Sequence, residues 1–195
     1  MPRIYIILSG LLFAVLQSAY FFVLEIRLTA AYPSFLAVTL GWLVGSVVGL
    51  RWGSRLAEMM WINLSLLAFF GTQTLLYKFP YATWMLPVAA LMIAVSGAQA
   101  GAFFRQNREM LKSASRLFFW ENNGFIVGWI VGFTCFVQFG PVYLIIGPAA
   151  MALSVALSGV LARRSVFEFA STPIALSDAP AGAGDDTGEG DAVRF

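Results

Sequence analysis

The chain has 195 residues, of which 59% are hydrophobic and only 11% are charged, and its formal net charge is +2. A soluble domain carries about 25% charged residues, so this chain has too little polar surface to cover a core in water. The mean hydropathy of +0.80 points the same way. Composition therefore excludes a soluble enzyme and indicates an integral membrane protein with one folded domain.

Two residue types that carry much of protein chemistry are scarce. Histidine is absent, and Cys135 is the single cysteine. The chain therefore offers no imidazole ligand for haem, chlorophyll or zinc, no Ser-His-Asp triad and no internal disulfide. We expect no metal site and no cofactor bound covalently or through histidine. The 18 Phe and 6 Trp are compatible with contact to lipid, quinone or pigment, but no polar ligand set points to one of these.

Six continuous apolar segments predict an all-α, polytopic membrane protein with six transmembrane helices. Each segment is close to the ~20 residues that cross ~30 Å of hydrocarbon as a helix. Continuous rather than alternating hydrophobicity argues against transmembrane strands, and prolines in the tight turns at 77–80 and 139–141 separate neighbouring helices. The predicted segments are 4–28, 33–50, 59–77, 81–103, 117–139 and 142–161.

Basic residues lie mostly on one side of the six predicted segments. The other side has only Arg27 and Lys78. The positive-inside rule then predicts that both termini are cytoplasmic and that the protein spans a cytoplasmic (inner) membrane. Because topology alone accounts for these basic residues, we expect no nucleic-acid partner. The nine residues of the basic side are Arg3, Arg51, Arg55, Arg105, Arg108, Lys112, Arg116, Arg163 and Arg164.

The C-terminal part of the chain has a different composition. Residues 171–195 contain five acidic residues and one basic residue among Gly, Ala, Ser and Pro. Such a segment cannot bury enough apolar surface to fold. We therefore divide the chain into a transmembrane domain, residues 1–164, and a disordered acidic cytoplasmic tail, residues 165–195, which acts as a solvated leash or as a partner-binding segment.

Glycines spaced four residues apart form ladders on three of the predicted helices. This GxxxG spacing puts each set on one helix face, where a missing side chain lets a neighbouring backbone approach closely. The ladders on the second and fifth segments occupy the middle helix of each half, so a 3+3 inverted repeat, an arrangement common in transporters, is one architecture that they allow. The predicted helix-packing glycines are Gly41, Gly45, Gly49, Gly97, Gly101, Gly124, Gly128 and Gly132.

Few polar residues lie inside the predicted spans. Glu121, Asn122 and Asn123 are about one turn into the fifth segment, where a carboxylate is costly unless it is paired. Its candidate partners are Arg51, Arg55 and Arg116, or a bound cation. Glu25 and Arg27 lie near the outer end of the first segment, two residues apart and so on different faces, which favours interfacial snorkelling. These five polar residues are the candidate polar sites.

Two motifs resemble a known family of membrane proteins. Residues 40–46, LGWLVGS, and 53–58, GSRLAE, are similar to a "G-x-x-x-G-S … G-x-R-L-A-D" run in the membrane domain of the spermidine synthase-like membrane proteins. Residues 124–128, GFIVG, are similar to a glycine-spaced helix of the same family. Those multi-pass proteins look like half of a major-facilitator transporter and often precede a soluble aminopropyltransferase-like domain.

The sequence also departs from that family pattern. Where the family has Tyr, Asn and Thr before its glycine-spaced helix, this chain has Phe118, Glu121 and Asn122. After Arg164 there are 31 residues, with no strand followed by a glycine-rich nucleotide loop. The resemblance therefore implies a free-standing membrane module without the soluble aminopropyltransferase domain, and we expect no enzymatic activity.

Three functions agree with these observations. The first is a non-catalytic integral membrane subunit or scaffold that packs into a larger membrane complex, because the polar residues are few and the glycine ladders favour tight helix packing. The second is a small transporter-like protein for a polyamine or another cation, with Glu25 or Glu121 as the acidic group. The third is a membrane anchor for a separately encoded aminopropyltransferase. Membrane lipid and other membrane subunits are the expected partners.

Overall fold

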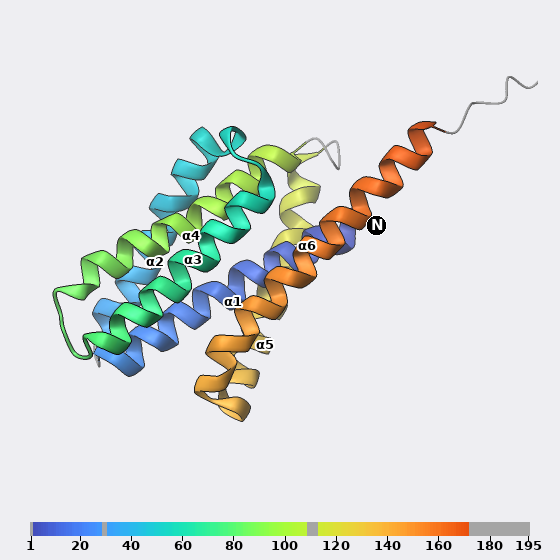
Figure 1. The fold of residues 1–195 in the computed structure, drawn as a ribbon. Helices are drawn as coiled ribbons and strands as arrows, with labels where there is room; N and C mark the ends of the chain where they lie inside the picture. Colours follow the sequence, from blue (N-terminus) through green and yellow to red (C-terminus); the bar gives the residue numbers. More distant parts are fainter. Residues whose placement is uncertain (1, 29–30, 109–112, 172–195) are drawn as a thin grey trace, which may run out of the picture.

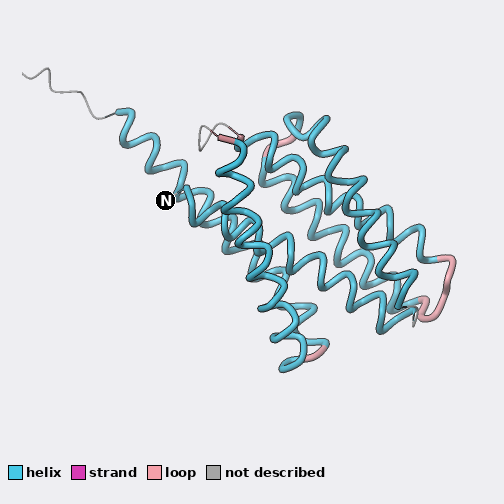
Figure 2. Tube along the Cα trace, turned by 180° about the vertical axis from the view of Figure 1, so that it is seen from behind, coloured by secondary structure: helices cyan, strands magenta, loops and turns pink. Residues whose placement is uncertain are grey.

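The computed structural model describes residues 2–28, 31–108 and 113–171, and almost all of them are helical (Figures 1 and 2). Six helices within these ranges are long and apolar enough to cross a membrane, which confirms the prediction of an all-α bundle with six such helices. They are α1 (Pro2–Leu28), α2 (Ala31–Trp52), α3 (Glu58–Lys78), α4 (Met85–Asn107), α5 (Ala114–Phe139) and α6 (Pro141–Ser171), with a short 3₁₀ turn η1 (Gly53–Arg55) after α2.

The start of α4 differs from the predicted one. The helix begins at Met85 rather than at residue 81, because Tyr81 adopts a left-handed backbone conformation with φ of 61°. That conformation cannot continue a right-handed helix. The backbone N–H of Tyr81 instead donates to the carbonyl of Arg27, at 2.8 Å. The connection between α3 and α4 is therefore attached to the end of α1.

The end of α6 also differs from the predicted domain boundary at residue 164. The helix continues to Ser171, so residues 165–171 are helical and are not part of a disordered tail. The sequence from 165 to 171 contains no Pro or Gly, and the first helix-breaking residue is Pro173. Figures 1 and 2 show these last turns projecting beyond the other helices. The remaining 24 residues of the predicted tail, 172–195, lie outside the described residues.

The helices pack in two similar groups around α1 and α4. Helices α2 and α3 pack on α4, and helices α5 and α6 pack on α1. Exchanging α1 with α4, α2 with α5 and α3 with α6 maps these four contacts onto one another. These four contacts follow the pattern expected of a 3+3 repeat, whereas the weaker contacts of α1 with α2, α1 with α3 and α5 with α6 have no such counterpart among the described residues. Because equivalent helices are three positions apart in the chain, an odd number, the second half runs in the opposite direction through the bundle.

Glycine and alanine form the contact between the parallel helices α2 and α4. A Cβ built at Gly41 would lie 2.8 Å from the carbonyl oxygen of Ala90, and one at Gly45 would lie 2.7 Å from the carbonyl carbon of Ala94. From the other side, a Cβ at Gly97 would lie 2.5 Å from the carbonyl oxygen of Trp42. The two backbones touch, and only glycine fits at these positions. Gly49 and Gly101 lie at the same contact, which we call the α2–α4 seam.

A second seam of the same kind joins the parallel helices α1 and α5. A Cβ at Gly128 would lie 2.8 Å from the carbonyl oxygen of Leu11, and one at Gly132 would lie 2.8 Å from the hydroxyl of Ser18. Gly124 faces the backbone of Ile7. All eight glycines of the predicted ladders therefore lie at helix–helix contacts. Gly10, which lies outside the predicted ladders, belongs to the same seam, because a Cβ there would lie 2.9 Å from the carbonyl carbon of Glu121.

A buried polar network joins the two groups of helices. The hydroxyl groups of Tyr20 on α1 and Ser96 on α4 are 2.8 Å apart. Ser96 also donates to the backbone carbonyl of Ser65 on α3, at 3.2 Å, and the hydroxyl of Ser65 donates to the side-chain oxygen of Gln99. These four side chains are nearly inaccessible to solvent. Hydrogen bonds of this kind connect helices where apolar packing alone gives little specificity.

Candidate functional site: a cavity between α2 and α5

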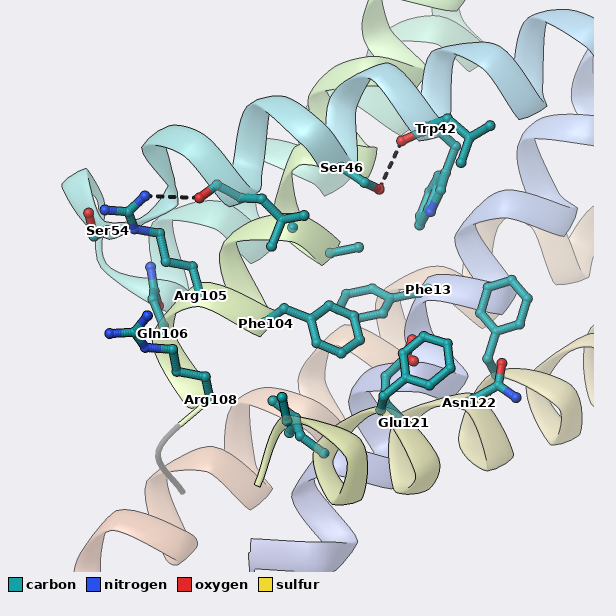
Figure 3. Close-up of a pocket in the computed structure, with 18 residues that line it drawn as sticks. Phe13, Trp42, Ser46, Ser54, Phe104, Arg105, Gln106, Arg108, Glu121 and Asn122 are labelled. Carbon is teal, nitrogen blue, oxygen red and sulfur yellow. Dashed lines mark hydrogen bonds between the residues drawn. The ribbon is translucent and has the colours of Figure 1, made fainter. Parts of the chain in front are cut away.

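A cavity of about 1000 Å³ lies where α2 and α5 diverge (Figure 3). The seams hold α2 on α4 and α5 on α1, but neither seam joins α2 to α5, and the space between them stays open. Helices α1 and α4 contribute Phe13 and Phe104 to its walls. Its aromatic residues are Phe13, Trp42, Phe104, Phe118 and Phe125, and its polar residues are Ser46, Ser54, Arg105, Gln106, Arg108, Glu121 and Asn122.

Among the described residues that line this cavity, Glu121 is the only carboxylate, and it is 7% exposed. In the described part of the chain its side chain forms no hydrogen bond and no ion pair with Arg51, Arg55 or Arg116, so the predicted structural ion pair is not observed. Arg116 is exposed near the start of α5. A carboxylate that is so deeply buried without a partner needs either a proton or a cation.

The basic end of the bundle, where α2 and α4 end and α3 and α5 begin, forms one end of the cavity. Arg105 donates from one guanidinium nitrogen to the backbone carbonyls of Leu50 and Arg51, at 2.9 and 2.6 Å. Gln106 donates to the carbonyl of Leu56, at 2.9 Å. These bonds satisfy carbonyls at the end of α2 and in the following turn. They also fix the positive charge of Arg105 at the cavity wall (Figure 3).

The other four predicted polar residues are divided between the cavity and other surfaces. Asn122 lines the cavity beside Glu121. Asn123 is exposed outside it and donates to the carbonyl of Phe119, at 2.6 Å. Arg27 lies at the opposite end of the bundle, with its guanidinium carbon 5.1 Å from the centre of the Tyr77 ring. Glu25, near Arg27, is half-buried, and one of its carboxylate oxygens has no hydrogen-bond partner.

The sequence did not predict that Phe13, Trp42, Phe104 and Arg105 line the same cavity as Glu121. Phe13, Trp42 and Phe104 are typical membrane-helix residues, and Arg105 fits the positive-inside pattern without a further role. One signal was available. Ala90, Ala94, Ala98 and Ala102 repeat the four-residue spacing of the α2 glycines and are compatible with a helix on which α2 packs, although alanine is common in every membrane helix. That pairing would have placed α2 on α4 and the fifth segment elsewhere.

The donor set of the cavity can bind a charged ligand. No group of three His, Cys, Asp or Glu that could hold a metal ion occurs among the residues that the structure describes. A single carboxylate, two arginines, amides and hydroxyls can orient a charged ligand, and the aromatic faces can surround its apolar part. Comparisons of this chain with protein-family models, with curated proteins and with solved structures gave no match.

Proposed function

We propose that this protein binds a small organic cation in the cavity between α2 and α5 and acts as a small transporter-like membrane protein. One observation carries the proposal: Glu121 is a buried carboxylate on the wall of a cavity of about 1000 Å³, and none of the described residues pairs with its side chain. The 3+3 contact pattern around α1 and α4 supports it, because repeats of this kind recur in transporters.

The cavity has the chemical features that an ammonium group requires. A carboxylate in a low-dielectric site attracts a cation far more strongly than one in water. Phe13, Trp42 and Phe125 line the same space, and aromatic faces add about 0.5–2 kcal/mol for each well-placed cation–π contact. The volume is at the upper end of the ~300–1000 Å³ of ligand pockets. An alkylammonium ion can therefore bind with its charge at Glu121 and its chain against the aromatic rings.

Calorimetric titration of hexylammonium into the protein in lipid nanodiscs tests this proposal. We expect saturable binding by the wild type and at least tenfold weaker binding by Glu121→Gln, which removes the charge and keeps the shape. Glu25→Gln is the matched control, since it removes a carboxylate at the opposite end of the bundle and should bind as the wild type does. Equal affinity of the wild type and Glu121→Gln would contradict the proposal.

A second candidate function is the non-catalytic membrane subunit or scaffold. The rim of the cavity favours it, because Leu43, Leu50 and Phe118 are all about half exposed or more and the space between them is open. A helix of a partner subunit could cover this rim. A membrane anchor for a separately encoded aminopropyltransferase, as the resemblance to the spermidine synthase-like family implies, is a variant of this candidate. Purification in mild detergent separates the candidates, because a subunit or anchor retains a stoichiometric protein partner.

The proposed membrane orientation follows the charge distribution. We propose that the basic end faces the cytoplasm and that the protein spans an inner membrane, because Arg51, Arg55, Arg105 and Arg108 gather there. The cavity then has its basic end toward the cytoplasm. A ligand from the cytoplasm would meet Arg105 before it reaches Glu121.

A further inference from the structure

The two signs of charge in the cavity are separated along the bundle. Glu121 is seven residues past Ala114, where α5 begins, so it lies about 10 Å along the helix from the basic end. Arg105 and Arg108 lie at the other side of the cavity, in the last turn of α4 and just after it. Figure 3 shows Ser54, Arg105, Gln106 and Arg108 gathered at one end of the cavity and Glu121 with Phe13 and Asn122 at the other.

This separation restricts the charge of the ligand. One carboxylate can neutralise one ammonium group, and a second ammonium on the same ligand would reach toward Arg105 and Arg108, where like charges repel it. An anionic group at that position is attracted instead. Arg105 is suited to bind it, because only one of its guanidinium nitrogens donates to the carbonyls of Leu50 and Arg51, and a guanidinium carries five N–H donors.

We infer that the cavity is specific for a zwitterion, with the ammonium group at Glu121, an apolar body along Phe13 and Phe104, and a carboxylate or phosphate at Arg105. Diamines and polyamines are rejected by the arginines at the basic end. This inference rests on the proposed function, keeps the ammonium group at Glu121, and narrows the ligand to one that also carries an anionic group. A zwitterionic compound from the aqueous phase and the headgroup of phosphatidylethanolamine share this chemistry, since the rim of the cavity is open between α2 and α5.

Three probes with the same six-carbon chain test the inference in nanodiscs of phosphatidylglycerol. They are 6-aminohexanoate, hexylammonium and 1,6-diaminohexane. We expect 6-aminohexanoate to bind the wild type at least tenfold more tightly than hexylammonium, and 1,6-diaminohexane to bind most weakly. Hexylammonium or 1,6-diaminohexane binding as tightly as 6-aminohexanoate would overturn the inference. Failure of all three probes to bind would instead contradict the proposed function, so the two failures are distinguishable.

Variants of Arg105 test whether this residue causes the preference for 6-aminohexanoate over hexylammonium. Arg105→Gln should reduce the preference for 6-aminohexanoate over hexylammonium to less than threefold, and Arg105→Lys, which keeps the charge, should retain most of it. Because Arg105 also bonds the end of α2, the thermal stability of each variant is measured first. Arg108→Gln is the second variant, and it should lower the preference without removing those bonds. An unchanged preference in both Gln variants would overturn the inference.

A comparison of nanodiscs with and without phosphatidylethanolamine distinguishes the two sources of the zwitterion. Nanodiscs that contain phosphatidylethanolamine should weaken the binding of 6-aminohexanoate if the headgroup occupies the cavity. Unchanged affinity assigns the site to a water-soluble zwitterion. Glu121→Gln controls this comparison, because it removes the ammonium partner in both kinds of nanodisc.

Discussion

Replacing Gly45 with leucine tests whether the α2–α4 seam holds the bundle together. Even a single Cβ at Gly45 would lie 2.7 Å from the carbonyl carbon and 2.9 Å from the Cα of Ala94. Both are backbone atoms, so no rotamer change relieves the clash, and the helices must separate by on the order of 1 Å. A gap of ~0.5–1 Å forfeits about a quarter to a half of each dispersion contact that it opens, and overpacking typically costs ~1–3 kcal/mol. We expect the free energy of unfolding to decrease by an amount at the upper end of that range.

Gly71 on α3 provides the matched control, because a Cβ there would meet nothing within 4 Å. Gly71→Ala should be neutral or more stable by up to ~1 kcal/mol, since alanine is the better helix former. The free energy of unfolding is measured by steric trapping in bicelles, and the midpoint of thermal unfolding in detergent is measured alongside it. If Gly45→Leu were as stable as the wild type, the backbones at this seam would not be in contact, and the packing account would be wrong.

Three further predictions concern orientation, the core and the tail. Reporters inserted within residues 105–116 and at Lys78 should report opposite sides of the membrane, with 105–116 cytoplasmic; export of the first reporter would reverse the proposed orientation. Tyr20→Phe removes the 2.8 Å hydrogen bond to Ser96 and should lower the free energy of unfolding by ~0.6–1.7 kcal/mol. A decrease below ~0.3 kcal/mol would show that this bond does not stabilise the fold. Truncation after Ser171 should leave membrane insertion and detergent stability unchanged, and loss of insertion would show that the tail contributes to folding.

The helices and their glycine faces could be predicted because both depend on local pattern. A run of ~20 apolar residues determines a span, and a four-residue glycine spacing determines a face. Gly45 and Gly128 lie at seams as that spacing leads one to expect. The partner of each face was harder to predict. Alanine is common in all membrane helices, so the α4 residues that meet the glycines of α2 did not stand out.

The cavity depends on long-range geometry that no local pattern encodes. It exists because α2 packs on α4 and α5 packs on α1, while α2 and α5 form no extensive contact among the described residues. The expected ion pair of Glu121 failed for the same reason. Position along the chain suggested Arg51, Arg55 or Arg116 as a partner, but the packing turns Arg105 toward the end of α2 and leaves the Glu121 carboxylate facing the cavity. The predicted domain boundary at residue 164 lies before the end of α6 at Ser171. The composition changes gradually in this region, and the first helix-breaking proline comes only at Pro173.

The most direct test of the central claim is the anomalous electron density of a bromine-labelled ligand in crystals of the protein. A bromoalkylammonium ion soaked into wild-type crystals should give one bromine peak between Phe13 and Phe104, with the ammonium group within hydrogen-bonding distance of Glu121. The same peak should be absent from Glu121→Gln crystals. A peak at full occupancy in those crystals, or a wild-type peak only outside the cavity, would contradict the assignment of Glu121 as the cation site.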